Sequence, residues 1–222
     1  MEIELRAVVE SIQVGRTQTY LGDDGKSWES AIGKTTVAGP VVVHPESLEG
    51  DQQADRVHHG GLDKAILAYS CAHFDAWKID FPDCSVSGGT FGENLTVDGM
   101  SEPDVCIGDV FQVGSSVLQV SQPRQPCWKL SRKWNLPKLA VHVQKTGRTG
   151  WYFRVIETGV INPGDLLELI DRPHAEFSVM RAHKIMHTKR RSKADDLMLS
   201  DCEALSSSWR DQLRLRADRP ER

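Results

Sequence analysis

The sequence predicts a mainly β protein with some α structure: a β-barrel with flanking helices over residues 1–171, followed by a small three-helix domain at residues 172–222. Two observations indicate this fold class. The first three quarters of the chain consist of short apolar or alternating runs interrupted by glycine, proline and aspartate, which is typical of a barrel. After Pro173 the patterns are helical, so we place the domain boundary at about residues 171–174.

Four segments carry the clearest strand signals. The run IELRAVV, residues 3–9, alternates apolar and charged side chains, and Val41–Val43 is a short apolar run. DVFQVGSSVLQVSQP predicts a hairpin that turns at Gly114–Ser116. Gly108–Asp109 and Gly164–Asp165 each look like a tight turn that leads into a strand.

Two helices are expected within the barrel region. LDKAILAYSCAHFDAWKI has an N-cap candidate at Asp63 and apolar or aromatic side chains at helical spacing up to Trp77. LPKLAVHVQKTG has Pro137 in its first turn and Gly147 at its C-terminal stop. We therefore predict helices over both segments.

Three further helices are expected in the C-terminal region. Ser178 can cap VMRAHKIMH, a second helix begins at Ser192 or Lys193 and runs through Leu199, and CEALSSSWRDQLRLR forms the third. The basic stretch HTKRRSK, residues 187–193, is read as a solvated loop between helices, with a docking surface as the alternative.

Composition excludes several classes of protein. The chain has 222 residues, 39% hydrophobic and 26% charged, which is typical of soluble globular proteins. No apolar run approaches the roughly 18 residues of a membrane span, and the N-terminus lacks the pattern of a secretory signal, so we expect a cytoplasmic protein without membrane contact. A net charge of -4 gives no case for stable nucleic-acid binding, and a homodimer is compatible with the sequence.

The five cysteines are widely spaced and contain no C-x-x-C pair, so we expect reduced thiols rather than disulfides or a zinc knuckle. In QPRQPCW, two prolines restrict the backbone around Arg124 and Cys127. A thiol held in this way can be a metal ligand, a nucleophile or a small buried hydrophobe. We expect Cys71 in the core of a helix and Cys202 in the C-terminal region. The cysteines are Cys71, Cys84, Cys106, Cys127 and Cys202.

The densest group of polar residues lies in GDQQADRVHHGGLDKAILAY. Paired glycines allow close approach of a ligand to the backbone, a helix start favours an anion, and arginine and lysine can pair with phosphate. The structural alternative is a glycine-shaped turn with surface histidines. The residues are Asp55, Arg56, His58, His59, Gly60, Gly61 and Lys64.

Three weaker candidates lie elsewhere. In SGGTFGENLTV, Glu93 and Asn94 enter a strand and could bind a heterocycle or merely close a loop. In TGRTGWYFRV, arginines that include Arg154 flank two aromatic residues, which suits an anionic aromatic ligand or an ordinary core strand. In SAIGKTTVAGP, Lys34 and Thr35 could bind a phosphate, although the Walker spacing is absent.

Four ordered segments together resemble the MOSC domain, the C-terminal module of molybdenum cofactor sulfurases, in its bacterial stand-alone YiiM-like branch. They are DRVHHGGLDKAILAY, FGENLTVDGMSEPDVCIGDVFQVG, VSQPRQPCWKL and GRTGWYFRVIETGVINPGD. The resemblance extends from about Ile3 to Ile170, and the remaining tail resembles the three-helix extension of that branch.

The resemblance implies a MOSC-type β-barrel that holds a molybdenum cofactor, a mononuclear metal on a pterin dithiolene (molybdopterin). It also implies reduction of N-hydroxylated compounds such as hydroxylamino purines and pyrimidines, a detoxification of mutagenic base analogues. Cys127 is then the metal ligand, Arg124 faces the cofactor phosphate or keeps the thiol deprotonated, and His58 or His59 is a candidate proton donor. The expected cofactor-binding residues are Lys34, Thr35, Asp55, Arg56, His59, Gly60, Gly61, Glu93, Asn94, Arg124 and Arg154.

Two other functions stay open at this point. One is a module that carries molybdenum cofactor without turnover, and the other is a thiol enzyme with Cys127 as nucleophile and His58 or His59 as base. The sequence shows no flavin motif, haem site or iron–sulfur spacing, so a reductase of this kind needs a separate, flavin-type electron donor.

Overall fold

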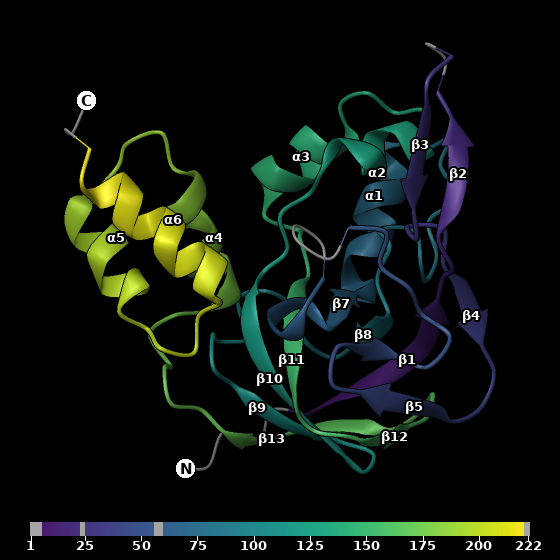
Figure 1. The fold of residues 1–222 in the computed structure, drawn as a ribbon, viewed down its shortest axis with the longest axis horizontal. Helices are drawn as coiled ribbons and strands as arrows, with labels where there is room; N and C mark the ends of the chain where they lie inside the picture. The colour runs from purple at the N-terminus through teal and green to yellow at the C-terminus, as the bar shows by residue number, and fades with distance from the viewer. Residues whose placement is uncertain (1–5, 23–24, 56–59, 220–222) are drawn as a thin grey trace.

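A closed barrel of seven strands forms the body of the protein in the computed structural model, which describes residues 6–22, 25–55 and 60–219 (Figure 1). Around the barrel the strands follow the order β1-β8-β7-β11-β10-β9-β13, and β13 pairs with β1 to close it. All neighbours are antiparallel except the parallel pair β7 and β8. The barrel strands are β1 (Arg6–Val14), β7 (Ile66–Ser70), β8 (Leu95–Asp98), β9 (Val110–Val113), β10 (Ser116–Pro123), β11 (Trp151–Glu157) and β13 (Leu166–Asp171).

Smaller elements cover the two ends of the barrel. At one end, the hairpin of β2 (Gln18–Leu21) and β3 (Ser27–Ser30) stands beside the helices α1 (Phe74–Asp80), α2 (Trp128–Lys133) and α3 (Leu139–Thr146) (Figure 1). At the other end lies the sheet β12-β5-β6, and β4 pairs antiparallel with the last residues of β1. These strands are β4 (Thr35–Val37), β5 (Val41–His44), β6 (Ser47–Leu48) and β12 (Gly159–Ile161).

The helix predicted over residues 62–79 is wrong in its first half. Only the short 3₁₀ turns η1 (Leu62–Lys64) and η2 (Cys71–His73) and the later helix α1 are helical, whereas Ile66–Ser70 is strand β7. All five residues of β7 are buried because the strand lies between β11 and β8. A strand buried on both faces is a continuous apolar run without alternation, so its spacing can mimic a helix. Cys71 accordingly lies in η2, half-buried, and not in a helical core.

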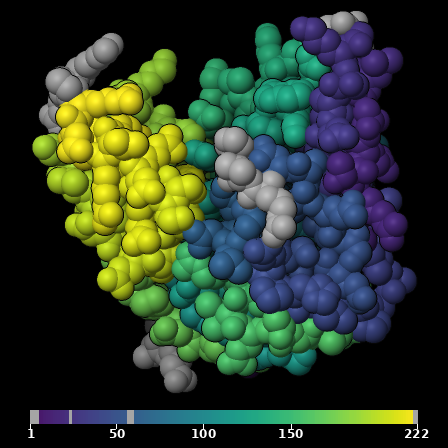
Figure 2. Space-filling model, in the orientation of Figure 1, coloured from purple at the N-terminus to yellow at the C-terminus, as the bar shows by residue number. Residues whose placement is uncertain are grey.

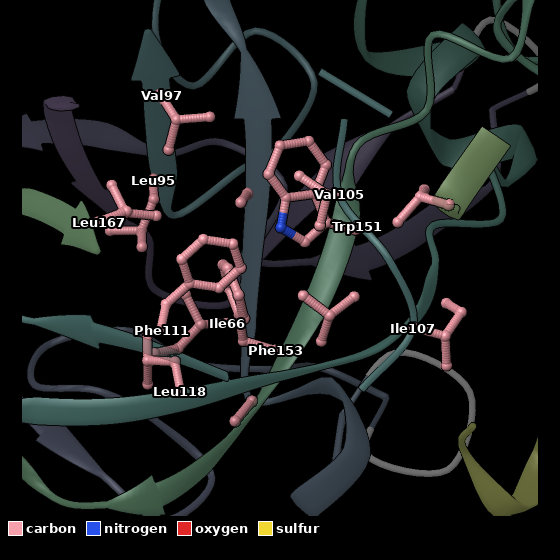
Figure 3. Close-up of a cluster of buried hydrophobic side chains, with 14 of the residues drawn as sticks. Ile66, Leu95, Val97, Val105, Ile107, Phe111, Leu118, Trp151, Phe153 and Leu167 are labelled. Atoms are coloured by element: carbon pink, nitrogen blue, oxygen red, sulfur yellow. The ribbon is translucent and has the colours of Figure 1, made fainter. Parts of the chain in front are cut away.

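Aromatic side chains fill the centre of the barrel. Trp151 and Phe153 come from β11, Phe111 comes from β9, and Ile66 comes from β7 (Figure 3). The rings of Phe111 and Phe153 meet edge to face at 6.0 Å, and those of Trp151 and Phe153 at 6.3 Å. The interior is therefore packed rather than open, and a ligand site has to lie at an end of the barrel.

The predicted hairpin is confirmed, and so is the second helix, although it begins at Leu139 and leaves Pro137 before its first turn. Strands β9 and β10 pair on either side of a turn at Gly114, whose φ of 55° lies in the left-handed region that glycine favours. Helix α3 ends at Gly147, which has a φ of 75° and donates its N–H to the Val143 carbonyl.

Three helices follow the barrel, as the sequence predicts: α4 (Val179–His187), α5 (Lys193–Ser200) and α6 (Ser207–Ala217). A serine side chain caps each one, Ser178, Ser192 and Ser206 respectively. The third helix begins five residues later than its predicted start, because the segment 202–206 turns inward and buries Leu205. None of the helices formed by the described residues has the length and apolar character needed to cross a bilayer.

The helical bundle packs against the barrel wall, mainly along β10, and the two share one continuous apolar core (Figures 1 and 2). The Ser206 N–H donates to the Ser121 carbonyl of β10 at 2.9 Å. Trp209 and Leu213 of α6 belong to the same buried cluster as Leu118 and Val120 of β10. The C-terminal helices thus cover apolar barrel surface that would otherwise be exposed.

Two histidines of α4 make the bundle sensitive to acid. Burial lowers the pKa of His183, and it lowers the pKa of His187 from 6.5 to about 4, with further contributions from His183 and Arg216. The unfolded chain gains these protons near pH 6.5, so the free energy of unfolding should decrease as the pH falls from about 6.5 towards 4, by on the order of 2 kcal/mol. Denaturant unfolding at pH 7 and pH 4.5 measures this loss. The variant His187→Gln should lose less stability over that interval, and an unchanged loss would contradict the assignment.

Candidate functional site

A pocket opens at the end of the barrel that carries the β2–β3 hairpin and α2. Most of its described lining residues come from within four segments: residues 30–34 at the end of β3, residues 51–55, residues 91–94 before β8, and residues 124–129 between β10 and α2. Lys64, Leu67 and Tyr152 line it as well. Among the described residues, the charged members of the lining are four cations and two acids, which favours an anionic ligand. They are Lys34, Lys64, Arg124, Lys129, Asp51 and Asp55.

Cys127 lines this pocket at the point where β10 gives way to α2. Pro126 precedes it, and Cys127 has an extended backbone with φ -107° and ψ 167° directly before the first residue of the helix. None of the five cysteines forms a disulfide, and the other four are absent from the described lining of the pocket. The stiff segment therefore presents one half-buried thiol to the site.

Arg124 reaches the pocket with an incomplete set of hydrogen bonds. Its backbone N–H donates to the Gly150 carbonyl at 3.0 Å, and its Nη2 donates to the Phe91 carbonyl at 3.1 Å. The residue is only 5% exposed, yet its Nη1 is buried and has no hydrogen-bond partner among the described residues. A buried guanidinium with an unsatisfied donor is costly on its own and well suited to an anion.

A buried network of hydrogen bonds forms another part of the pocket lining. Lys34 Nζ donates to both carboxylate oxygens of Asp51, at 2.6 and 2.7 Å, and Asn94 Nδ2 donates to Asp51 at 2.8 Å. Asn94 Oδ1 also accepts from the Leu67 N–H of β7 at 3.1 Å. Burial lowers the pKa of Lys34, although the charge of Asp51 opposes that shift. Lys34 and Asn94 therefore both line the pocket and fix its walls.

Glu93 lies behind the pocket wall and not on it. Its fully buried carboxylate accepts the N–H groups of Gly89 at 2.7 Å and Phe91 at 2.9 Å. Burial raises the pKa of Glu93. The loop that it shapes carries the Phe91 carbonyl that accepts from Arg124, so Glu93 supports the position of the Arg124 guanidinium from behind the described lining.

The other predicted cofactor-binding residues divide into two groups. Asp55 lines the pocket, and so does Lys64 of η1. Thr35 is exposed on β4, and Arg154 is engaged with Asp63 at 2.8 Å on the wall outside the pocket lining.

The remaining predicted residues are the pair Gly60 and Gly61 and the residues just before it. Gly60 is buried. Gly61 directly precedes η1 and has a φ of 84°, a conformation that glycine adopts more easily than other residues, so Gly61 allows the backbone turn here. Arg56, His58 and His59 lie outside the described residues.

Sequence reasoning missed Asp51, the acid that holds the pocket together. It is 9% exposed, accepts the Gly15 N–H at 2.7 Å and pairs with Lys34. Its sequence neighbours are polar and give no sign of burial. The sequence pointed to Asp51 only indirectly: if Lys34 is buried in a pocket, a carboxylate must lie close to it.

Comparison with known proteins identifies related chains. The family model described as "MOSC domain" matches residues 55–168. The Bacillus subtilis protein YflK is 45% identical over 215 residues, 96% of each chain. A Gibberella moniliformis protein named "Reductase" is 34% identical over 197 residues, 87% of this chain and 34% of that protein. The crystal structure of YiiM from Geobacillus stearothermophilus has a TM-score of 0.81 and 37% identity, over 95% of this chain and 99% of that one.

Proposed function

The chain belongs to the MOSC domain family, in the YiiM-like branch, and from this membership we propose that it is a molybdenum-cofactor-dependent reductase of N-hydroxylated compounds. Its substrates are hydroxylamino purines and pyrimidines, which it returns to the amines. The fungal relative named "Reductase" supports an oxidoreductase activity. The observation that carries the proposal is a single pocket that presents both the Cys127 thiol and the unsatisfied Arg124 guanidinium.

The residues of the pocket fit this cofactor, which brings both a phosphate and a metal. Among the described residues, no group of three histidine, cysteine or acidic side chains could hold a metal ion. A pterin dithiolene would bring two sulfur ligands of its own to a metal at this site. The Cys127 thiolate adds a further soft ligand. The open Nη1 of Arg124 and the cationic lining suit the phosphate.

Five described residues of the pocket have a part in the proposed reaction. When bound, the cofactor supplies the two-electron chemistry that removes the oxygen from an N–OH group. Cys127 would hold the metal, and Arg124, oriented by the Phe91 carbonyl, would hold the phosphate. Lys34, Asp51 and Asn94 keep the facing wall in place through bonds of 2.6–2.8 Å.

The reaction also needs protons and electrons from elsewhere. Conversion of a hydroxylamine to an amine and water consumes two protons and two electrons. His58 or His59 remains the proposed proton donor, because imidazole can give and recover a proton near neutral pH. Electrons would come from a separate flavin-type reductase.

One experiment separates this function from its alternatives. Protein purified from a host that makes the cofactor should contain molybdenum and pterin in equal amounts, and should convert 6-N-hydroxylaminopurine to adenine with a chemical reductant. Bound molybdenum without conversion would identify a cofactor carrier instead. Conversion by metal-free protein would identify a thiol enzyme that uses Cys127 as nucleophile.

A further inference from the structure

Three aromatic side chains form a continuous wall, which we call the aromatic wall: Tyr20 of β2, Trp28 of β3 and Trp128 of α2. The rings of Tyr20 and Trp28 stack with centroids 4.4 Å apart and planes at 17°. Trp28 and Trp128 meet edge to face at 5.5 Å. The wall thus joins the hairpin to the first turn of the helix that follows Cys127.

The wall lies next to the pocket, because its residues neighbour pocket-lining ones, although none of the three rings is itself in the described lining. Trp28 lies two residues before Ser30 on β3, so both side chains point to the same face of the strand, and Ser30 lines the pocket. Tyr20 lies directly opposite Trp28 in the hairpin. Trp128 is next to the pocket-lining Cys127.

A hydrogen bond fixes the two halves of the wall to each other. Lys129, which lines the pocket, donates from Nζ to the Glu29 carbonyl of β3 at 2.9 Å. Helix α2 and the hairpin are therefore tied together at the residues next to Trp128 and Trp28.

Trp128 is unusually open for its residue type. Its side chain is 51% exposed, whereas Trp77, Trp151 and Trp209 are all 1% exposed or less. Trp28 and the Arg132 guanidinium, 5.1 Å from the ring centroid, hold the indole while leaving about half of its surface to solvent. A large, fixed and solvent-facing ring beside a pocket is the arrangement that binds planar heterocycles by stacking.

We propose that the aromatic wall is the platform on which the heterocyclic ring of the substrate stacks, with Trp128 as the contacting residue. Trp28 and Tyr20 position Trp128, and Lys129 and Arg132 place positive charge around it. The inference rests on the proposed function, because a hydroxylamino base carries its N–OH group in the plane of such a ring. Stacking on Trp128 would hold that group beside the pocket that Cys127 lines.

Binding to the cofactor-free protein tests the platform without any turnover. Titration calorimetry should detect adenine binding to the wild type, and Trp128→Leu should weaken it roughly 10- to 100-fold, as loss of a stacking contact does. Trp128→Phe keeps a ring and should stay within about threefold of the wild type. Leu215→Ala removes another side chain that is 65% exposed, on α6, and serves as the matched control. Equal adenine affinity in the wild type and Trp128→Leu would overturn the proposal, as would a wild type that binds no adenine.

Kinetics of the cofactor-loaded enzyme gives an independent second test. Trp128→Leu should raise KM for 6-N-hydroxylaminopurine by the same roughly 10- to 100-fold and leave KM for hydroxylamine, which has no ring, unchanged. An equal loss of kcat with both substrates would overturn the platform and show that Trp128 merely supports Cys127. The two proposals can fail separately: a wild type that binds adenine on Trp128 but reduces no hydroxylamino base would refute the reductase and leave the platform standing.

Discussion

Cys127→Ser should yield protein that contains almost no molybdenum and reduces hydroxylamino bases at least about 100-fold more slowly than the wild type. A serine hydroxyl stays protonated at neutral pH and is a hard ligand, whereas the metal of this cofactor is matched by a soft thiolate. The change removes no apolar contact from the main core, because Cys127 lies on the pocket lining. Metal analysis of purified protein and turnover with a chemical reductant measure the two effects.

Cys71→Ser is the control for this substitution. The Cys71 thiol lies outside the described pocket lining and donates to Asp98, and burial together with that carboxylate raises its pKa to about 11. It is therefore protonated at neutral pH, and its replacement should leave metal content and turnover near wild type. Wild-type molybdenum content in Cys127→Ser would show that the thiol is not the ligand.

Arg124→Met should lose at least roughly tenfold in cofactor affinity without losing stability. The guanidinium is buried, and its Nη1 has no partner among the described residues, so its removal takes away the proposed phosphate contact and an unsatisfied buried donor. The loss of its side-chain hydrogen bond to the Phe91 carbonyl offsets only part of that gain in stability. The melting temperature of the cofactor-free variant should stay level with the wild type or rise. Pterin content after dialysis and thermal unfolding of the cofactor-free protein report the two quantities.

Arg154→Met should give the opposite pattern. Arg154 donates to Asp63 and Gln119 outside the described pocket lining, so its loss leaves those partners unpaired while the pocket stays intact. We expect lower stability and unchanged cofactor affinity. If both arginine variants released the cofactor equally, the phosphate assignment to Arg124 would be refuted.

Local signals in the sequence were sufficient wherever one segment determines its own structure. The serine caps of the C-terminal helices, the turn at Gly114 and the stop at Gly147 each depend on residues a few positions apart. The placement of Cys127 on a pocket was likewise predictable from its two neighbouring prolines and the order of the family motifs.

Features that depend on residues far apart in the sequence could not be predicted from such local signals. Residues 66–70 became a strand because β11 and β8, from elsewhere in the chain, bury both of its faces. Asp51 is paired with Lys34 and Asn94, which lie 17 and 43 positions away. The Glu93 carboxylate accepts two N–H groups of its own loop, a local role that its sequence position before a strand did not reveal. One amino-acid sequence, read without structural information, does not reveal which distant residues will pair.

The pairing of β1 with β13 determines when the barrel can form during synthesis. The first described strand has its closing partner at residues 166–171, and the helices that cover β10 come later still. A nascent chain emerges from its N-terminus, so the chain must leave the ribosome at least as far as residue 171 before the barrel closes. Until then the edge of β1 and the apolar face of β10 remain open to other chains. The strand that closes the barrel therefore makes folding late and sets a long interval in which the chain depends on protection from aggregation.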